Sequence, residues 1–235
     1  QPLRALFARK YRMNSAVTEF SIRTKRRQSQ ICISPIFLRH PAHRIIGWHR
    51  LNQFSLLRKT IRKYKSEAIP SDTIERMLDA AAQSPTTGGM QLYSVVITTD
   101  TDIKEELAKS HFNQPAATGA PMLLTFCADF NRFIKWCEQS NAKPGFGNFQ
   151  SFVAAFLDAT IFAQQFCTIA EMNGLGCCYL GTTTYNAPQI AKTLNLPQYV
   201  VPIATLSVGI PDDDSAKSER IPLQGIIHKE RYADY

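Results

Sequence analysis

One apolar segment, residues 148–173, constrains the fold of this chain more than any other feature. Large apolar side chains recur through it at helical spacing, namely Phe149, Phe152, Val153, Phe156, Leu157 and Ile161. The other side of the predicted helix carries small residues, namely Ala154, Ala155, Ala159 and Ala163. A helix that is apolar or small nearly all round has to be buried on more than one face. The pattern therefore predicts a central helix, a subunit interface, or both, with Gly174 as a left-handed C-cap.

Apolar strands and amphipathic helices alternate along the rest of the chain. We expect buried strands at residues 93–99, 122–128, 176–181 and 200–210. We expect helices at residues 51–57, 72–83, 101–110 and 187–194. Asp72 and Glu75 have the spacing of a capping box at the start of one of them. The alternation indicates a layered α/β or α+β domain.

Positive charge is concentrated before residue 54. Residues 1–53 contain 11 Lys and Arg against one acid, Glu19, whereas residues 54–235 contain 16 Lys and Arg against 18 acids. The net charge of +8 is therefore a property of a basic leader, not of the domain that follows. The leader is open to several interpretations: sequence without a biochemical role, a targeting peptide, or an arm that binds nucleic acid or an anionic surface. No recognisable motif supports a nucleic-acid partner, so we do not favour one.

The cysteines show neither paired metal-site spacing nor a secreted disulfide framework. They are Cys32, Cys127, Cys137, Cys167, Cys177 and Cys178. The adjacent Cys177 and Cys178 should point to opposite sides of their predicted strand. We expect reduced, mostly buried thiols, no metal site and a cytoplasmic location. We also expect no membrane partner, on the interpretation that no apolar run reaches spanning length.

The motifs of several familiar enzyme classes are missing. The chain has no Walker loop, no GxGxxG after a strand, no GxSxG and no HExxH. Residues 54–235 contain only two histidines, His111 and His228. If the domain is an enzyme, we therefore expect a bound cofactor to carry the difficult step.

Two segments have the composition of ligand-binding elements. In an extended segment Arg58, Thr60 and Arg62 would share one side, and two guanidiniums with a hydroxyl suit a phosphate monoester. The alternative is a solvated surface strand. Residues 86–91 combine two hydroxyls, two glycines and an amide, which suits a loop in close contact with a ligand. The alternative there is an ordinary helix–strand connection.

Several short blocks, in this order along the chain, resemble the nitroreductase family of FMN-dependent oxidoreductases. The blocks are Lys59-Thr60-Ile61-Arg62-Lys63-Tyr64, Ile69-Pro70, Ser84-Pro85-Thr86-Thr87 with Gln91, Gly174-Leu175-Gly176-Cys177-Cys178-Tyr179-Leu180-Gly181, Leu196-Pro197, Val201-Pro202 and Val208-Gly209-Ile210-Pro211. Another block is similar to the branch of oxygen-insensitive NADPH nitroreductases and NADPH-flavin reductases, namely Cys127-Ala128-Asp129-Phe130-Asn131-Arg132. The resemblance covers residues 54 to about 232.

This resemblance implies an α+β fold of three layers, with a central, mostly antiparallel sheet flanked by helices. It implies an intertwined homodimer with FMN at the subunit interface and an FMN-binding domain over residues 54–235. The reaction would be ping-pong: NADPH or NADH passes a hydride to flavin N5, and a small-molecule acceptor such as a nitroaromatic or quinone then takes its place. No side chain would itself be catalytic. An NAD(P)H-flavin reductase is the alternative within this class.

Motif matching also assigns positions in the flavin site. The phosphate and ribityl chain would be held by Arg58, Lys59, Thr60 and Arg62, joined by Arg220. The partner subunit would contribute Thr86, Thr87, Gly88 and Gln91. The ring would contact Gln114, Tyr179, Leu180, Gly181 and Thr182. Ser218 and Thr182 depart from the branch pattern, and the chain ends without the long C-terminal arm of the branch, so the choice between NADPH and NADH stays open.

Overall fold

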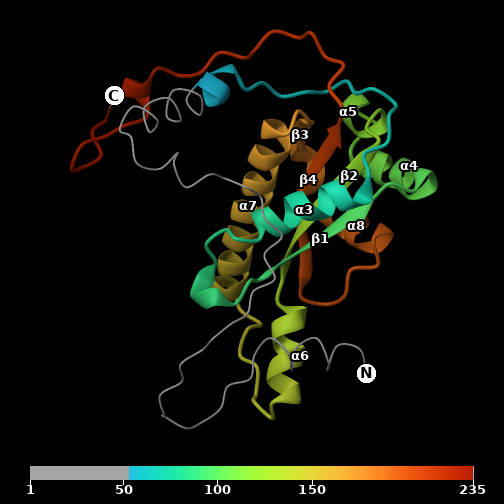
Figure 1. Ribbon diagram of the computed structural model, residues 1–235. Coiled ribbons are helices and arrows are strands. Elements are labelled where there is room, and N and C mark those ends of the chain that lie inside the picture. The colour runs from blue at the N-terminus through green and yellow to red at the C-terminus, as the bar shows by residue number, and fades with distance from the viewer. Residues whose placement is uncertain (1–52, 235) are drawn as a thin grey trace, which may run out of the picture. The chain divides into compact units, whose positions relative to one another are not determined.

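A four-stranded antiparallel sheet forms the centre of the fold in the computed structural model, which describes residues 53–234 (Figure 1). Its strands are β1 (Tyr93–Thr98), β2 (Met122–Asp129), β3 (Gly176–Leu180) and β4 (Val200–Gly209). Their order is β1-β2-β4-β3, and each neighbouring pair is antiparallel. All four strands were predicted to within one residue at each end. The expected leader of residues 1–53 lies outside the described residues except for Gln53, and Cys32 lies outside them too.

Helices cover both faces of this sheet. One face carries α3 (Ser71–Ala81) and α7 (Phe149–Met172). The other carries α4 (Thr101–Ser110), α5 (Pro115–Thr118) and α8 (Ala187–Thr193), as the two sides of Figure 1 show. The three-layer α+β architecture is therefore confirmed. The described residues also contain α6 (Asn131–Gln139) and short 3-10 turns at Thr87–Gly89, Gly181–Thr183 and Leu223–Gly225. Residues 53–57 are helical too, and they are the described part of the helix expected at residues 51–57.

Each face of the sheet has its own apolar core. Phe126 of β2 packs against Phe162 and Phe166 of α7, with ring centroids 5.4 and 5.9 Å apart. The other core gathers buried residues of α4, β2 and α8, such as Leu107, Leu123 and Ile190. Cys177 belongs to the first core and Cys178 to the second. The expectation that these neighbours point to opposite sides of a strand is confirmed.

The long helix α7 has well-defined ends. Its N-cap Asn148 accepts a hydrogen bond from the Ser151 amide, 2.9 Å away. At the other end Gly174 has φ 84°. The Gly174 amide donates to Glu171 O and the Leu175 amide to Ala170 O, both at 3.0 Å. This pair of bonds is a Schellman motif, which confirms the glycine cap.

Among residues 53–234, only one side of α7 is covered by other parts of the chain. On the side of α7 that faces the sheet, Phe162 and Phe166 are buried. On the opposite side, Leu157 and Ile161 are 51% and 41% exposed. By length and composition this helix could cross a membrane, so the expectation that no apolar run reaches spanning length is wrong. The length of the helix was predicted, but polar residues interrupt its apolar run, and these include Asp158, which lies on the buried side.

Two helices differ from the sequence expectation. Pro70, not Asp72, is the N-cap of α3, and no side chain caps the helix. Asp72 instead pairs with Arg76 at 3.2 Å on the surface, so the capping box is not formed. The helix α6 was not predicted, although it is strongly amphipathic: Cys137 is buried, and Phe133 and Ile134 pack partly buried against the core.

Candidate functional site

The segment of residues 58–64 is held beside the sheet by contacts to distant parts of the chain. The Ile61 amide donates to Cys177 O of β3 at 3.2 Å. Tyr64 forms an antiparallel bridge with Pro211, where the C-terminal tail begins just beyond β4. Two segments separated by about 150 residues are thus placed side by side.

The tail brings further polar groups to this segment. Lys59 Nζ donates to the carbonyls of Asp213 and Ser215, both at 2.8 Å. The Arg62 amide donates to Asp213 Oδ2 at 2.8 Å. Hydrogen bonds from Ser215 and Arg62 hold the pKa of the exposed Asp213 carboxyl below its usual range. Arg220 lies farther along the same tail, exposed, with its guanidinium on backbone carbonyls of residues 218 and 219.

Arg58 faces a different direction from the rest of this set. Its Nε lies 3.1 and 3.0 Å from the two carboxylate oxygens of Glu171 on α7, and its Nη2 lies 2.9 Å from Oε1. The side chains of Arg58 and Glu171 are only 27% and 9% exposed. Arg58 therefore already has a directly hydrogen-bonded carboxylate partner, whereas Lys59 donates its hydrogen bonds to backbone carbonyls and acts on the Asp213 carboxyl only through its charge.

The loop of residues 86–91 is anchored by a residue that sequence reasoning missed. Asp158 of α7 is 2% exposed. Its Oδ1 accepts hydrogen bonds from the Thr87 amide at 2.8 Å and hydroxyl at 2.9 Å, and its Oδ2 accepts from the Leu92 amide at 3.2 Å. The sequence signal was a single carboxylate within an otherwise apolar helix.

Backbone geometry supports the assignment of residues 86–91 as a specialised loop. Gly88, Gly89 and Gln91 have φ values of 56°, 70° and 53°, which favour glycine at the first two positions. The Arg132 guanidinium donates to the carbonyls of Gln91 and Tyr93. Arg132 belongs to the block that resembles the reductase branch, and the structure assigns it a role in holding the loop's exit.

A second group of predicted residues does meet. Gln114 Nε2 lies 3.3 Å from Thr182 Oγ1, although 68 residues separate them in the chain. His111, which was not predicted as a site residue, places Nδ1 2.8 Å from the same hydroxyl. Its Nε2 has no hydrogen-bond partner among the described residues. Burial lowers the pKa of this fully enclosed imidazole to about 4, so it is neutral at physiological pH.

The remaining predicted residues lie at the end of β3. Tyr179 is 37% exposed, whereas Leu180 is buried in the core beneath α4 and α8. Leu180 can therefore present only its backbone to a ligand. Gly181 is exposed, and a Cβ added there would meet no atom within 4 Å. The backbone at Gly181 is open to a flat ligand.

An apolar pocket lies apart from these residues. It is lined mainly by aromatic side chains of the segments flanking α6 and by Tyr199, including Phe130, Phe146, Phe149 and Phe152. None of the predicted site residues contributes to it.

Comparison with known proteins identifies the family. The model of the nitroreductase family matches residues 57–210. The FMN reductase (NAD(P)H) of Bacillus subtilis is 31% identical over 176 residues, covering 74% of this chain and 71% of that protein. A crystal structure of a Bacteroides fragilis protein is 50% identical, with TM-score 0.77, covering 78% of this chain and 74% of that one. A nitroreductase structure from B. subtilis is 28% identical, with TM-score 0.75, covering 77% and 74%. The chain belongs to the nitroreductase family.

Proposed function

We propose that this chain is an FMN-dependent NAD(P)H oxidoreductase acting on small-molecule acceptors such as nitroaromatics or quinones. The family membership supports an oxidoreductase, and the name of the 31%-identical relative, FMN reductase (NAD(P)H), supports both the flavin and the reductant. The scarcity of histidine and the absence of familiar catalytic motifs agree with chemistry carried by a cofactor. When bound, FMN supplies the two-electron redox chemistry between the nicotinamide and the acceptor.

The observation that carries the proposal is the junction of residues 58–64 with the C-terminal tail. It brings Lys59, Thr60 and Arg62 next to the segment that carries Arg220. Cations and a hydroxyl on adjacent segments suit the FMN phosphate. Arg58 is part of the proposed clamp, but because its charge is already paired with Glu171 we expect it to contribute less than Lys59.

We assign the ring-facing role to the Gln114–Thr182 pair and to the end of β3. The Thr182 hydroxyl is held from two sides, by Gln114 and by His111, so its orientation is fixed before any ligand arrives. Gly181 leaves backbone accessible, and Tyr179 and the Leu180 backbone flank it. These residues bind and orient the ring, and none of them needs to donate or accept a proton.

The proposal includes a homodimer. Members of this family are typically dimeric. The exposed side of α7 carries Phe149, Phe152, Leu157 and Ile161, an apolar surface that a second subunit would cover. In such a dimer the loop with Thr86, Thr87, Gly88 and Gln91 would reach the FMN of the partner. The five described cysteines are free and buried, which supports a reducing, cytoplasmic location.

The alternative function is an NAD(P)H-flavin reductase, in which free flavin is the electron acceptor. The relative named above is an FMN reductase. A panel of nitroaromatics, quinones and free flavin, offered to the reduced protein, separates these activities by rate. The third alternative, a leader that binds nucleic acid or an anionic surface, concerns residues outside the described part of the chain.

The phosphate site is tested by the double substitution Lys59→Ala and Arg220→Ala. Charge-assisted contacts contribute about 1.5–3 kcal/mol each, so FMN affinity should fall by at least about a hundredfold in a fluorescence-quenching titration. The double substitution Lys109→Ala and Lys143→Ala removes two exposed cations elsewhere and should leave affinity unchanged. Equal FMN affinity in both variants would place the phosphate at another site.

A further inference from the structure

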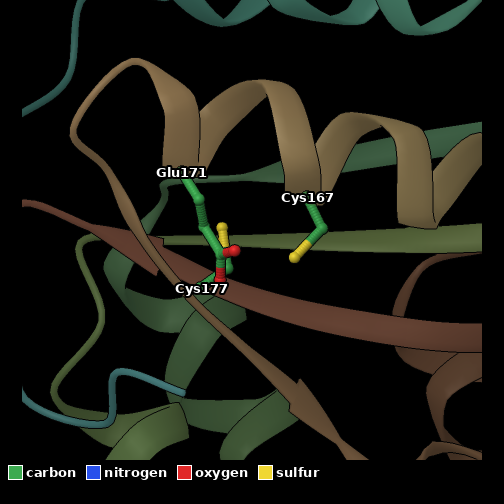
Figure 2. Close-up of side chains that lie close together, drawn as sticks. All are labelled: Cys167, Glu171 and Cys177. Carbon is green, nitrogen blue, oxygen red and sulfur yellow. The ribbon is translucent and has the colours of Figure 1, made fainter. Parts of the chain in front are cut away.

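Three potential metal ligands converge where α7 turns into β3. The Sγ atoms of Cys167 and Cys177 and a carboxylate oxygen of Glu171 all lie within 4.8 Å of one another. Figure 2 shows Cys167 and Glu171 projecting from the same side of α7 toward Cys177 on the strand beneath. Two residues four apart share a helix face, and the Schellman turn at Gly174 folds β3 back under it. The convergence is therefore a product of the local fold.

The cluster is enclosed, and two of its three ligands are thiols. Cys167 and Cys177 are 1% and 0% exposed, and the Glu171 side chain is 9% exposed. Thiolates are soft ligands that select ions such as Zn²⁺ and Cu⁺ over Mg²⁺ or Ca²⁺. The site thus has the donor set of a thiophilic metal site.

Arg58 supplies the outer contact that such a site needs. Its guanidinium bonds both oxygens of Glu171, which fixes the orientation of the carboxylate. Each carboxylate oxygen of Glu171 has two lone pairs. The hydrogen bonds from Arg58 therefore leave a lone pair on each oxygen that can coordinate a metal ion. Outer hydrogen bonds of this kind commonly orient metal ligands.

We propose that Cys167, Glu171 and Cys177 bind one thiophilic d¹⁰ ion, with Zn²⁺ as the reference case. Zn–S and Zn–O bonds are about 2.3 and 2.0–2.2 Å, so two sulfurs on a tetrahedral zinc lie about 3.8 Å apart. The ligands need to approach one another by no more than about 1 Å, which side-chain rotation provides. The two thiol protons leave to solvent as the Zn–S bonds form.

Charge balance supports binding in this buried place. Two thiolates and one carboxylate carry three negative charges, which a divalent ion and the Arg58 guanidinium together neutralise. A neutral cluster avoids the large cost of burying net charge. The bound ion would tie the last turn of α7 to the first residues of β3, and through Arg58 to the segment of residues 58–64.

The test is zinc binding by the full chain, with its flavin as purified. The reduced protein is incubated with Zn²⁺ and desalted, and zinc is counted by mass spectrometry and examined by X-ray absorption at the zinc edge. We expect one zinc per chain with two sulfur ligands at about 2.3 Å. A chain that retains no zinc, or retains it with nitrogen and oxygen ligands only, overturns the proposal.

Matched variants assign the site. Cys167→Ala and Cys177→Ala should each lose the retained zinc, whereas Cys178→Ala, which removes the neighbouring thiol on the opposite face of β3, should keep it. Far-UV circular dichroism and a thermal melt confirm that each variant is folded. Glu171→Gln should keep both sulfur ligands and bind zinc at least about tenfold more weakly. Equal zinc retention in the Cys178→Ala and Cys177→Ala chains would contradict the assignment.

Discussion

At the scale of single residues, the structure places buried polar groups where they hold functional segments in position. Asp158 receives three hydrogen bonds, two from Thr87 in the loop of residues 86–91 and one from Leu92 just after it. His111 and Gln114 hold the hydroxyl of Thr182. The sequence motifs identify residues that face a ligand, but they do not identify the supports behind them, because those supports are recognisable only once the chain is folded.

Replacing Asp158 by alanine should destabilise the protein by about 2–4 kcal/mol, because the donors of Thr87 and Leu92 lose a buried acceptor. Urea denaturation followed by circular dichroism measures the change. Asp72→Ala, which removes a carboxylate from an exposed pair, is the control and should cost less than about 1 kcal/mol. Equal losses in the two variants would show that Asp158 does not anchor the loop.

His111 predicts a pH dependence of stability. Burial lowers its folded-state pKa to about 4, below the ordinary value of 6.5, so between these values the unfolded chain binds more protons. The free energy of unfolding therefore has its full value above about pH 6.5 and decreases as the pH falls toward 4. From pH 7 to pH 5 the loss should be about 2 kcal/mol.

The measurement is the free energy of unfolding at both pH values for the parent chain and for His111→Gln. The variant should lose less stability than the parent on acidification, by about 2 kcal/mol. The same pH response in His111→Gln and the parent is incompatible with a buried neutral imidazole.

At the scale of elements, the apolar pattern of the sequence predicted all four strands of the sheet and the helices α3, α4, α7 and α8. The helix α4 has the predicted bounds, Thr101–Ser110, because its Asp100 cap and its apolar face agree. The helix α6 is strongly amphipathic as well but was not predicted, so its omission was not due to a missing pattern. The Asp72–Glu75 spacing suggested that α3 begins with Asp72 as its N-cap. In the structure the helix begins two residues earlier, with Pro70 at the N-cap position, so the local motif did not locate the start of the helix. The meeting of residues 58–64 with the tail depends on the sheet and is visible only in the fold.

The contact between residues 58–64 and β3 requires a glycine. A Cβ on Gly176 would lie 2.6 Å from Ile61 Cγ2 and 2.7 Å from Ile61 Cβ. Gly176→Ala should therefore push the segment of residues 58–64 off the sheet, cost about 1–3 kcal/mol and weaken FMN binding by at least about tenfold.

Denaturation and FMN titration of the same preparations measure both effects. Gly145→Ala, where a Cβ meets nothing within 4 Å, is the control and should change neither quantity. Unchanged FMN affinity in a destabilised Gly176→Ala chain would separate this segment from the phosphate site.

At the scale of the whole molecule, the exposed apolar side of α7 is not covered by any of the residues that the structure describes. Leu157→Glu with Ile161→Glu should convert the proposed dimer to a monomer, because charges at a buried apolar interface are strongly unfavourable. Light scattering coupled to size-exclusion chromatography gives the mass. The control is Ile103→Glu on α4, which changes a side chain as exposed as that of Ile161 and should leave the dimer intact. A double variant that keeps the dimeric mass would place the interface elsewhere.

The central claim, that this member of the nitroreductase family is an FMN-dependent NAD(P)H oxidoreductase, is tested most directly by the flavin spectrum. The purified full chain is equilibrated with FMN, desalted and titrated anaerobically with NADPH and, separately, NADH. We predict a yellow protein with one FMN per chain, whose visible absorbance is bleached by at least one nicotinamide and restored by a quinone or nitroaromatic. A chain that retains no FMN after equilibration, or a bound flavin that neither nicotinamide reduces, would contradict the account.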